Sequence, residues 1–278
     1  MAFTNLIRFK DGQGMIRYGD VREDQLDTLV NAEVDILDGD PLKGDLIRSG
    51  RVAIVHEVLC PVEEVPLVLC IGLNYAKHAL EANLPIPPSP VLFIKPPASI
   101  GGPFDDIPIP SHADLLDYEG ELCLVIGKTG KDIPENEADD YILGYTAGND
   151  ISSRFWQRPP HAGGQYCYAK GFDKFAPIGP TIRATHLTNT STLSLTTTVN
   201  GEERQSSLTG DMIFNTRHIV AHLSRGCTLA AGTVIMTGTP DGIAGRMSTP
   251  AWLKNNDVVR VSISGIGTIE NRMVFGKL

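Results

Sequence analysis

Residues 117–127 read DYEGELCLVIG, in which three acidic side chains at alternate positions lead into an apolar, β-forming tail. Successive side chains of a β-strand point to opposite faces, so Asp117, Glu119 and Glu121 are predicted to share one face of a strand. Neighbouring carboxylates repel each other, and each makes the next one harder to ionise. The stretch therefore predicts either positively charged groups close by or a strand that begins in water.

The composition is that of a globular protein with a substantial core. The chain has 278 residues, 42% of them hydrophobic, which allows one large domain or one domain with a smaller appendage. The formal net charge of −9 argues against nucleic-acid binding through bulk electrostatics. The 28 glycines and 19 prolines favour a turn-rich β protein over a helical bundle.

No segment reads as a membrane span or a secretory signal. A run of about 18 apolar residues is absent, and the opening MAFTNLIRFKDGQG lacks a long apolar core. The five cysteines form no C-x-x-C pair, which fits reduced thiols in a cytosolic protein. We expect a cytoplasmic protein without a membrane or nucleic-acid partner, and a mitochondrial location is the alternative.

Residues 1–64 are predicted to form a small N-terminal domain. Segments 5–10 (NLIRFK) and 14–21 (GMIRYGDV) read as two short strands around a KDGQG turn, which is a hairpin pattern. Pro61 marks the junction with the rest of the chain. Residues 65–278 are then predicted to form a second, larger domain.

This second segment reads mainly as strands with a few short helices. Residues 74–85 are predicted to form a short helix that Asn74 caps. Asn200 and Gly201 mark a hairpin turn, and residues 212–226 read as an amphipathic helix that ends at Gly226. The predicted fold class is therefore α+β and rich in β-structure.

A hard oxygen site is the first candidate for chemistry. Asp150 follows a strand-like segment and can reach the same sheet end as Glu119 and Glu121. Three carboxylates without a paired Cys or His select Mg²⁺ or Mn²⁺, or Ca²⁺, over zinc. Spacing alone leaves a solvated strand edge with ordinary surface acids as an equal alternative.

A histidine–carboxylate pair is the second candidate. His78 and Glu81 are three positions apart on the predicted helix and therefore share one face. A carboxylate beside an imidazole sets its tautomer and raises its basicity, which suits a general base. Spacing alone favours the alternative, an ordinary surface pair.

Three polar side chains after Asp150 form the third candidate. Arg154, Gln157 and Lys170 suit an anionic, oxygen-rich ligand, although their sequence positions alone favour the alternative of surface ion pairs. By contrast, His218 and His222 lie four positions apart without the glutamate of H-E-x-x-H, so we expect a surface or packing role for them.

Seven segments, in this order, resemble the fumarylacetoacetate hydrolase family and cover roughly residues 65–278. They are GLNYAKHALE, VLFIKPPASIGGP, DYEGELCLVIGK, GYTAGNDISSR, KGFDKFAPIGP, VNGEERQ and TGTPDGI. Within the family, the likeness is strongest to the branch that contains the fumarylacetoacetate hydrolase domain-containing protein 2 members and bacterial diene-dioate isomerases.

The resemblance implies a mixed β-sandwich roll, a homodimer, one Mg²⁺ or Mn²⁺, and a role for each matching residue. The implied metal ligands are Glu119, Glu121 and Asp150, and Asp117 is placed behind them. The implied catalytic residues are His78, Glu81 and Lys170, the first two on a segment that closes over the ligand as a lid. The implied substrate-binding residues are Arg154, Gln157, Thr239 and Lys95.

These roles predict an enzyme that acts on a 2-oxo or 1,3-dicarbonyl acid through a metal-stabilised enolate. Hydrolysis of a C–C bond in an acylpyruvate-like substrate ranks first, because the His78–Glu81 pair suits water activation. An oxaloacetate tautomerase or decarboxylase is the alternative, and a catalytically inactive metal-binding protein is the alternative of another class. Phe155 stands where similar sequences carry an acid, which predicts a less charged wall on the substrate side.

Overall fold

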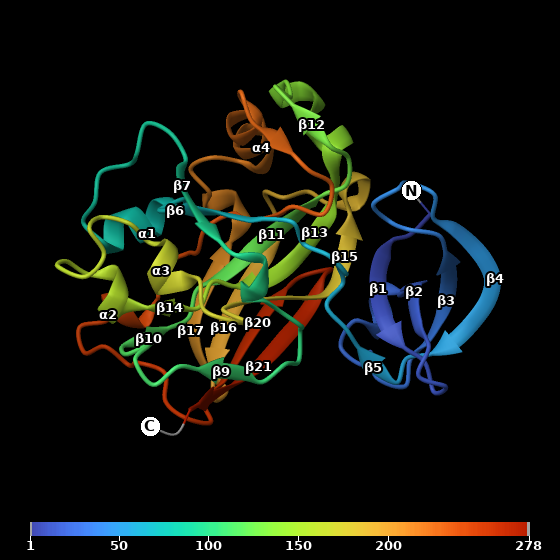
Figure 1. Cartoon of the computed structure of the whole chain (residues 1–278), viewed down its shortest axis with the longest axis horizontal. Helices are drawn as coiled ribbons and strands as arrows, with labels where there is room; N and C mark the ends of the chain where they lie inside the picture. The colour runs from blue at the N-terminus through green and yellow to red at the C-terminus, as the bar shows by residue number, and fades with distance from the viewer. Residues whose placement is uncertain (1, 277–278) are drawn as a thin grey trace.

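The computed structural model describes residues 2–276, and they form a β-rich α+β fold with mixed sheets (Figure 1). The predicted fold class is confirmed. Within these residues the α-helices are short: α1 (Ala76–Glu81), α2 (Arg154–Gln157), α3 (Cys167–Lys170) and α4 (Thr216–Ser224). The 3₁₀ turns are η1 (Glu23–Gln25), η2 (Pro97–Ser99), η3 (Glu135–Tyr141), η4 (Thr185–Leu187), η5 (Thr209–Asp211) and η6 (Ala244–Arg246).

A twelve-stranded sheet runs through the whole molecule. Its strands, in spatial order, are β4 (Ile47–Ile54), β3 (Glu33–Asp38), β2 (Ile16–Asp20), β1 (Asn5–Lys10), β15 (Ala176–Ala184), β13 (Ile142–Asn149), β11 (Gly120–Ile126), β19 (Val234–Met236), β6 (Val68–Gly72) and β7 (Val91–Lys95). Two short strands lie off this path, β5 (Glu57–Val58) on β1 and β8 (Ile100–Gly101) on β15.

A second, five-stranded sheet packs against the larger part of the first. Its order is β17 (Glu202–Leu208), β16 (Ser194–Val199), β20 (Val258–Ile263), β21 (Gly267–Phe275) and β9 (Ile107–Ile109). Two small ladders complete the fold: β10 (Leu116–Asp117) with β14 (Ser152–Ser153), and β12 (Gly130–Lys131) with β18 (Thr228–Leu229).

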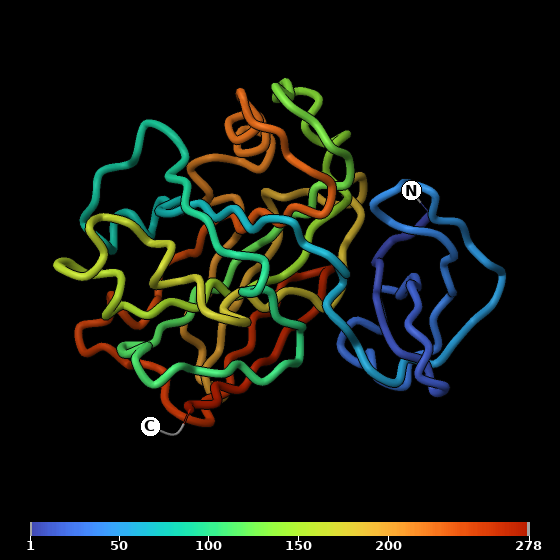
Figure 2. The backbone as a smooth tube through the Cα atoms, in the orientation of Figure 1, coloured from blue at the N-terminus to red at the C-terminus, as the bar shows by residue number. Residues whose placement is uncertain are grey.

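The N-terminal strands form a lobe at one end of the molecule, seen in blue in Figure 2. The lobe has its own apolar cluster, which includes Ile7, Phe9 and Val34. Strand β1 joins it to the larger body through Asn5 and Leu6, which pair with Arg183 and Ile182 of β15. The boundary after residue 64 stays a prediction.

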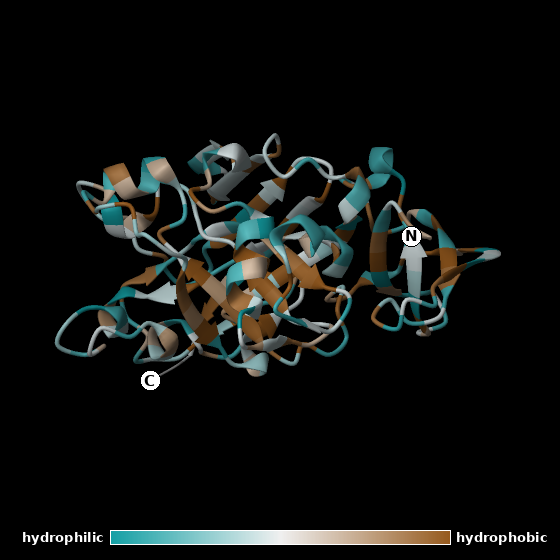
Figure 3. Cartoon of the chain, turned by 90° about the horizontal axis from the view of Figure 1, so that it is seen from above, coloured by the Kyte–Doolittle hydropathy of each residue, from teal (hydrophilic) through white to brown (hydrophobic). Residues whose placement is uncertain are grey.

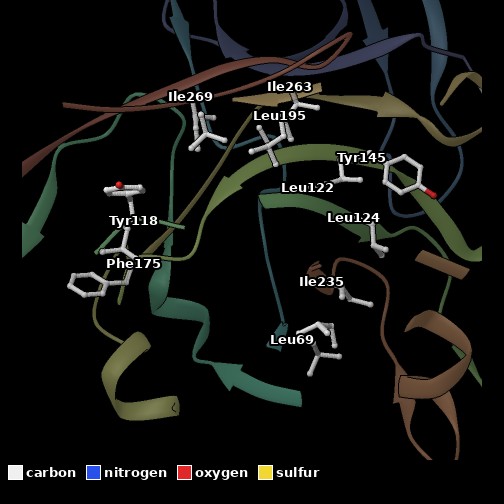
Figure 4. Close-up of a cluster of buried hydrophobic side chains, with 14 of the residues drawn as sticks. Leu69, Tyr118, Leu122, Leu124, Tyr145, Phe175, Leu195, Ile235, Ile263 and Ile269 are labelled. Atoms are coloured by element: carbon white, nitrogen blue, oxygen red, sulfur yellow. The ribbon is translucent and has the colours of Figure 1, made fainter. Parts of the chain in front are cut away.

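Strand β11 is buried on both faces, which explains its continuous apolar run. Leu122 and Leu124 belong to the cluster between the two sheets, together with Leu195 and Ile263 (Figure 4). Cys123 and Val125 pack into a second cluster on the opposite face. Figure 3 shows the same arrangement, with mainly apolar strands through the middle of the larger body.

Several local predictions are confirmed. The β16–β17 hairpin turns at Asn200 and Gly201, both with positive φ. The helix predicted over 212–226 is present, and Gly226 follows it with a φ of +71°, but it begins four residues later than predicted. Helix α4 begins after Asn215, because the Asn215 side chain caps it by accepting a hydrogen bond from the backbone N–H of His218.

The predicted cap of helix α1 is wrong. The N-cap is Tyr75, and the Asn74 amide instead donates to the carbonyls of Phe214 and Thr237 and accepts from the N–H of Phe214. Asn74 is fully buried, so it ties the segment before α1 to two distant loops rather than to its own helix. The helix is also shorter than predicted and ends at Glu81.

Gly120 lies at the closest approach of the two sheets. A Cβ atom at this position would lie 2.1 Å from Thr197 Oγ1 and 3.2 Å from Val261 Cγ1. The alternation of the strand directs this clash towards the five-stranded sheet, while Glu119 and Glu121 point the other way. The glycine between the two acids is therefore a packing requirement of the fold.

We predict that Gly120→Ala lowers the free energy of unfolding by about 1–3 kcal/mol, because Thr197 and Val261 must move to admit the methyl group. The matched control is Gly12→Ala, since a Cβ at Gly12 meets nothing within 4 Å and its φ is not positive. Urea denaturation of both variants measures the difference. Equal midpoints for the two variants would contradict the close approach of the sheets.

Candidate active site

A pocket of about 350 Å³ opens at the end of strand β11. Its lining comes from segments far apart in the sequence: Ile71, Gly72, Leu73, His78, Leu84, Phe93, Glu119, Arg154, Gln157, Arg158, Pro159, Tyr166, Lys170, Thr239, Ile243, Gly245 and Arg246. The lining includes charged side chains such as Glu119 and Lys170 and apolar ones such as Leu84, Phe93 and Ile243. The Lys170 ammonium lies over the Phe93 ring, 5.0 Å from its centroid.

The three predicted metal ligands lie together because of the register between β11 and β13. Glu121 pairs with Gly148 and Gly120 with Asn149, so Asp150 follows directly opposite Glu119 and donates its N–H to the Glu119 carbonyl at 2.8 Å. One carboxylate oxygen from each of the three acids lies within 4.8 Å of the other two. All three are buried, so the alternative of a solvated strand edge is wrong.

Two cations compensate part of this negative charge. Lys170 Nζ donates to Glu119 Oε2 at 2.8 Å and to Asp150 Oδ2 at 2.6 Å, and Arg154 donates from Nη2 to Glu119 Oε1. Burial alone would raise the pKa of Glu119, but Lys170 and Arg154 outweigh it and hold that pKa well below the usual range. The positive charge predicted from the alternating acids is present.

Glu121 differs from its neighbours because it has no ion-pair partner among residues 2–276. Its side chain accepts one hydrogen bond, from the N–H of Gly238 at 2.7 Å. Burial, and then the Asp150 and Glu119 carboxylates, raise its pKa well above the usual value. A buried carboxylate beside two others is stable as an anion only with a further cation.

Asp150, by contrast, has a cation beside each oxygen. Its Oδ2 accepts from Lys170, and its Oδ1 lies 2.6 Å from Lys95 Nζ without a hydrogen bond of good geometry from residues 2–276. Hard carboxylate oxygens without nitrogen or sulfur donors are the ligand set of Mg²⁺ and Mn²⁺. The residues present therefore fit a small divalent cation.

Lys95 is not among the residues that line the pocket. It is fully buried, and its ammonium contacts Asp150 Oδ1 and the carbonyls of Ile151 and Phe175. These contacts hold Asp150 in place. A role of Lys95 in substrate binding stays a prediction.

The histidine–carboxylate pair is formed on helix α1. His78 Nδ1 lies 3.0 Å from Glu81 Oε2, and the other Glu81 oxygen accepts from the N–H of Gly242 at 3.1 Å. Glu81 therefore both orients the imidazole and docks the helix on the 237–243 turn. Because Nδ1 is engaged and His78 lines the pocket, Nε2 is the nitrogen free to exchange a proton there.

The remaining predicted residues also meet at the pocket. Gln157 Oε1 accepts from Arg154 Nη1 at 2.8 Å, and Thr239 Oγ1 donates to the Gly120 carbonyl at 2.9 Å. Burial disfavours the Lys170 ammonium, but Asp150 and Glu119 outweigh this and raise its pKa. Lys170 is therefore a cation and a hydrogen-bond donor rather than a base.

Two further residues, Asp117 and Gln205, shape the site without lining the pocket, and only Gln205 has no predicted role in it. Asp117, fully buried, accepts from Arg154 Nε at 2.8 Å and from the N–H groups of Ala244 and Gly245 at 2.8 and 2.9 Å. Gln205 accepts from the Gly120 N–H at 2.9 Å and donates to Thr239 Oγ1 at 2.8 Å. Gln205 is the last residue of the VNGEERQ segment, so the resemblance to the family could have identified it as a site residue.

Phe155 does not line the pocket, so the predicted change in wall charge is not seen. Its ring stacks on His161, with centroids 4.3 Å apart, and meets Trp156 edge-on. The two α4 histidines, His218 and His222, do not line this pocket either. His218 instead contacts Glu135.

No helix within residues 2–276 is long and apolar enough to cross a membrane.

Comparison with known proteins gives consistent relatives. The chain is 40% identical over 218 residues to the mitochondrial oxaloacetate tautomerase of Xenopus laevis, which covers 78% of this chain and 68% of that protein. It is 38% identical over 217 residues to a mitochondrial oxaloacetate tautomerase of Bos taurus, and that alignment covers 78% of this chain and 69% of the relative. The crystal structure of 2-hydroxyhepta-2,4-diene-1,7-dioate isomerase from Mycobacterium marinum aligns with a TM-score of 0.84 and 33% identity, over 99% of this chain and 100% of that one.

The family match covers the whole pocket. The sequence model described as fumarylacetoacetate (FAA) hydrolase C-terminal matches residues 67–274, which contain every acid, cation and lining residue of the site. The chain belongs to the fumarylacetoacetate hydrolase family.

Proposed function

We propose that this chain is a Mg²⁺- or Mn²⁺-dependent tautomerase that interconverts the keto and enol forms of oxaloacetate or a similar 2-oxo acid. The observation that carries the proposal is the buried group of Glu119, Glu121 and Asp150 beside a pocket whose wall holds the His78–Glu81 pair. The names of the Xenopus laevis and Bos taurus relatives support the choice of substrate.

The three acids are the residues that would hold the cation. When bound, a divalent cation supplies a Lewis acid that stabilises negative charge on the carbonyl oxygen of the substrate as the enolate forms. Lys170 already neutralises Glu119 and Asp150 in part, and its ammonium faces the pocket. It is placed to donate a hydrogen bond to an anionic substrate oxygen.

His78 carries the proton step. The bond between hydrogen and the carbon next to the carbonyl breaks, and the proton passes to Nε2 of the neutral imidazole. The same nitrogen then gives a proton to the oxygen, so the keto form becomes the enol without any redox change. Glu81 stabilises the imidazolium that exists between the two transfers.

Hydrolysis of a C–C bond, which ranks first from the sequence alone, becomes the second candidate. The same His78–Glu81 pair would activate water for attack on a distal carbonyl, which is the observation that keeps this reaction open. Decarboxylation of oxaloacetate, and metal binding without any turnover, are the remaining alternatives. The homodimer and the compartment stay predictions from the sequence.

We predict that EDTA abolishes enzymatic tautomerisation of oxaloacetate, and that excess Mg²⁺ or Mn²⁺ restores it. The loss of ultraviolet enol absorbance measures the rate, with a protein-free Mg²⁺ sample subtracted. Pyruvate formation reports decarboxylation, and acylpyruvates tested in parallel report hydrolysis. Full activity in EDTA would contradict the metal dependence, and metal binding without turnover on any of these compounds would favour a binding protein.

We predict that Glu121→Gln weakens Mg²⁺ binding at least about tenfold in calorimetry, because it removes one of three oxygen ligands. The metal-free variant should melt no lower than the wild type, since one of three mutually repelling buried charges is gone. Glu137→Gln, an exposed acid of η3, is the matched control. Unchanged metal affinity in Glu121→Gln would contradict the site.

We predict that His78→Ala lowers kcat by about 10²–10⁴-fold and that Glu81→Gln lowers it by about tenfold, because the first removes the base and the second its orienting partner. KM should change little, since neither side chain is needed to hold the substrate carboxylate. Leu80→Ala is the control, because Leu80 is 82% exposed on the same helix. Full turnover by His78→Ala would exclude the proposed proton step.

A further inference from the structure

The arginines of this chain are almost all paired with acids, and two of the exceptions line the pocket. Within residues 2–276, only Arg158, Arg225 and Arg246 have no carboxylate oxygen within 4.0 Å of a guanidinium nitrogen. The other eleven all do. Arg158 and Arg246 both contribute to the pocket wall, and Arg225 does not. In a protein with a net charge of −9, two unpaired arginines at one pocket need an explanation.

Their exposure places them at the open end. Both side chains are exposed, whereas Glu119 and Lys170 of the same pocket are buried. Phe93 and Ile243 add apolar surface to the lining of the same pocket. The pocket therefore combines a buried group of acids with positive charge on exposed side chains.

The two arginines lie on segments that pack against each other. The Arg158 guanidinium lies over the ring of Trp252, 5.5 Å from its centroid. Trp252 in turn packs beside Gly245, since a Cβ added at Gly245 would lie 3.5 Å from Trp252 Cη2. Gly245 directly precedes Arg246, so Trp252 connects the two sides of the mouth.

Asp117 holds the same two segments from inside. It accepts from Arg154, the first residue of the α2 helix that Arg158 caps, and from the N–H groups of Ala244 and Gly245. A fully buried carboxylate with these partners sets the position of both segments. The two arginines therefore lie on segments that buried hydrogen bonds hold in place.

We propose that Arg158 and Arg246 bind a second carboxylate of the substrate, and that they make the enzyme selective for 2-oxo acids with a carboxylate at each end. The proposal rests on the proposed function, because it takes the 2-oxo acid end to lie at Glu119, Glu121 and Asp150. A guanidinium presents parallel N–H donors that match the two oxygens of a carboxylate. An unpaired arginine gives up no existing ion pair to make this contact.

The experiment compares oxaloacetate with its 4-methyl ester, which keeps the 2-oxo acid end and lacks the distal charge. The variants are Arg158→Gln, Arg246→Gln and the double variant, with Arg225→Gln as the matched control. We expect each single change to lower kcat/KM for oxaloacetate by about tenfold, and the double change by more. The values for the ester, and all values for Arg225→Gln, should stay within about twofold of the wild type.

Calorimetry on the Mg²⁺-loaded protein separates this proposal from the proposed function. If oxaloacetate binds without turnover, the tautomerase assignment fails, and the arginine proposal is judged on the affinity ratio of the two compounds. That ratio should favour oxaloacetate in the wild type and approach one in the double variant. Equal wild-type affinities, no detectable binding of oxaloacetate, or an equal loss for both compounds in the variants would overturn the role of Arg158 and Arg246.

Discussion

The contact of the Lys170 ammonium with Glu119 and Asp150, at 2.8 and 2.6 Å, is the interaction on which the site depends. It joins helix α3 to the ends of two neighbouring strands, β11 and β13. Without it, the β11–β13 register would bury carboxylates side by side with far less positive charge nearby. Burying an uncompensated ion costs several kcal/mol. The same contact keeps Lys170 protonated, so the residue that makes the acids compatible with burial also supplies a donor to the pocket.

The compensation is incomplete, and this connects the fold to the chemistry. The buried charged groups around the site are the acids Asp117, Glu119, Glu121 and Asp150 and the cations Lys95, Arg154 and Lys170. One negative charge therefore remains, and Glu121 has no cationic partner among residues 2–276. A divalent cation would turn this deficit into an excess of one positive charge, which an anionic 2-oxo acid then neutralises. The arrangement favours a bound pair of metal and substrate over either one alone.

The sequence predicts the features that depend on local periodicity and misses those that depend on distant contacts. The alternation of Glu119 and Glu121 and the turn at Asn200 follow from spacing within a few residues. Asp117 and Asn74 are different, since their partners lie 127 and up to 163 positions away. Asn74 before a helical segment is a good cap by its own neighbourhood, and only the packed loops show that its amide is used elsewhere. The resemblance to a family supplied the site residues because motif order carries this long-range information.

The acids lie on strands and the residues at the mouth of the pocket lie on loops, which explains how one family includes proteins named as tautomerases and as isomerases. The acids lie at the end of strands that are buried on both faces, so their geometry is set by two clusters of core side chains. The residues at the mouth lie on η6 and on the segment after α2, which carry little of the core. Since an enolate is an intermediate common to tautomerisation and isomerisation, a rigid acidic site of this kind would suit either reaction. Selectivity can then change through loop residues while the charge balance around Lys170 stays the same.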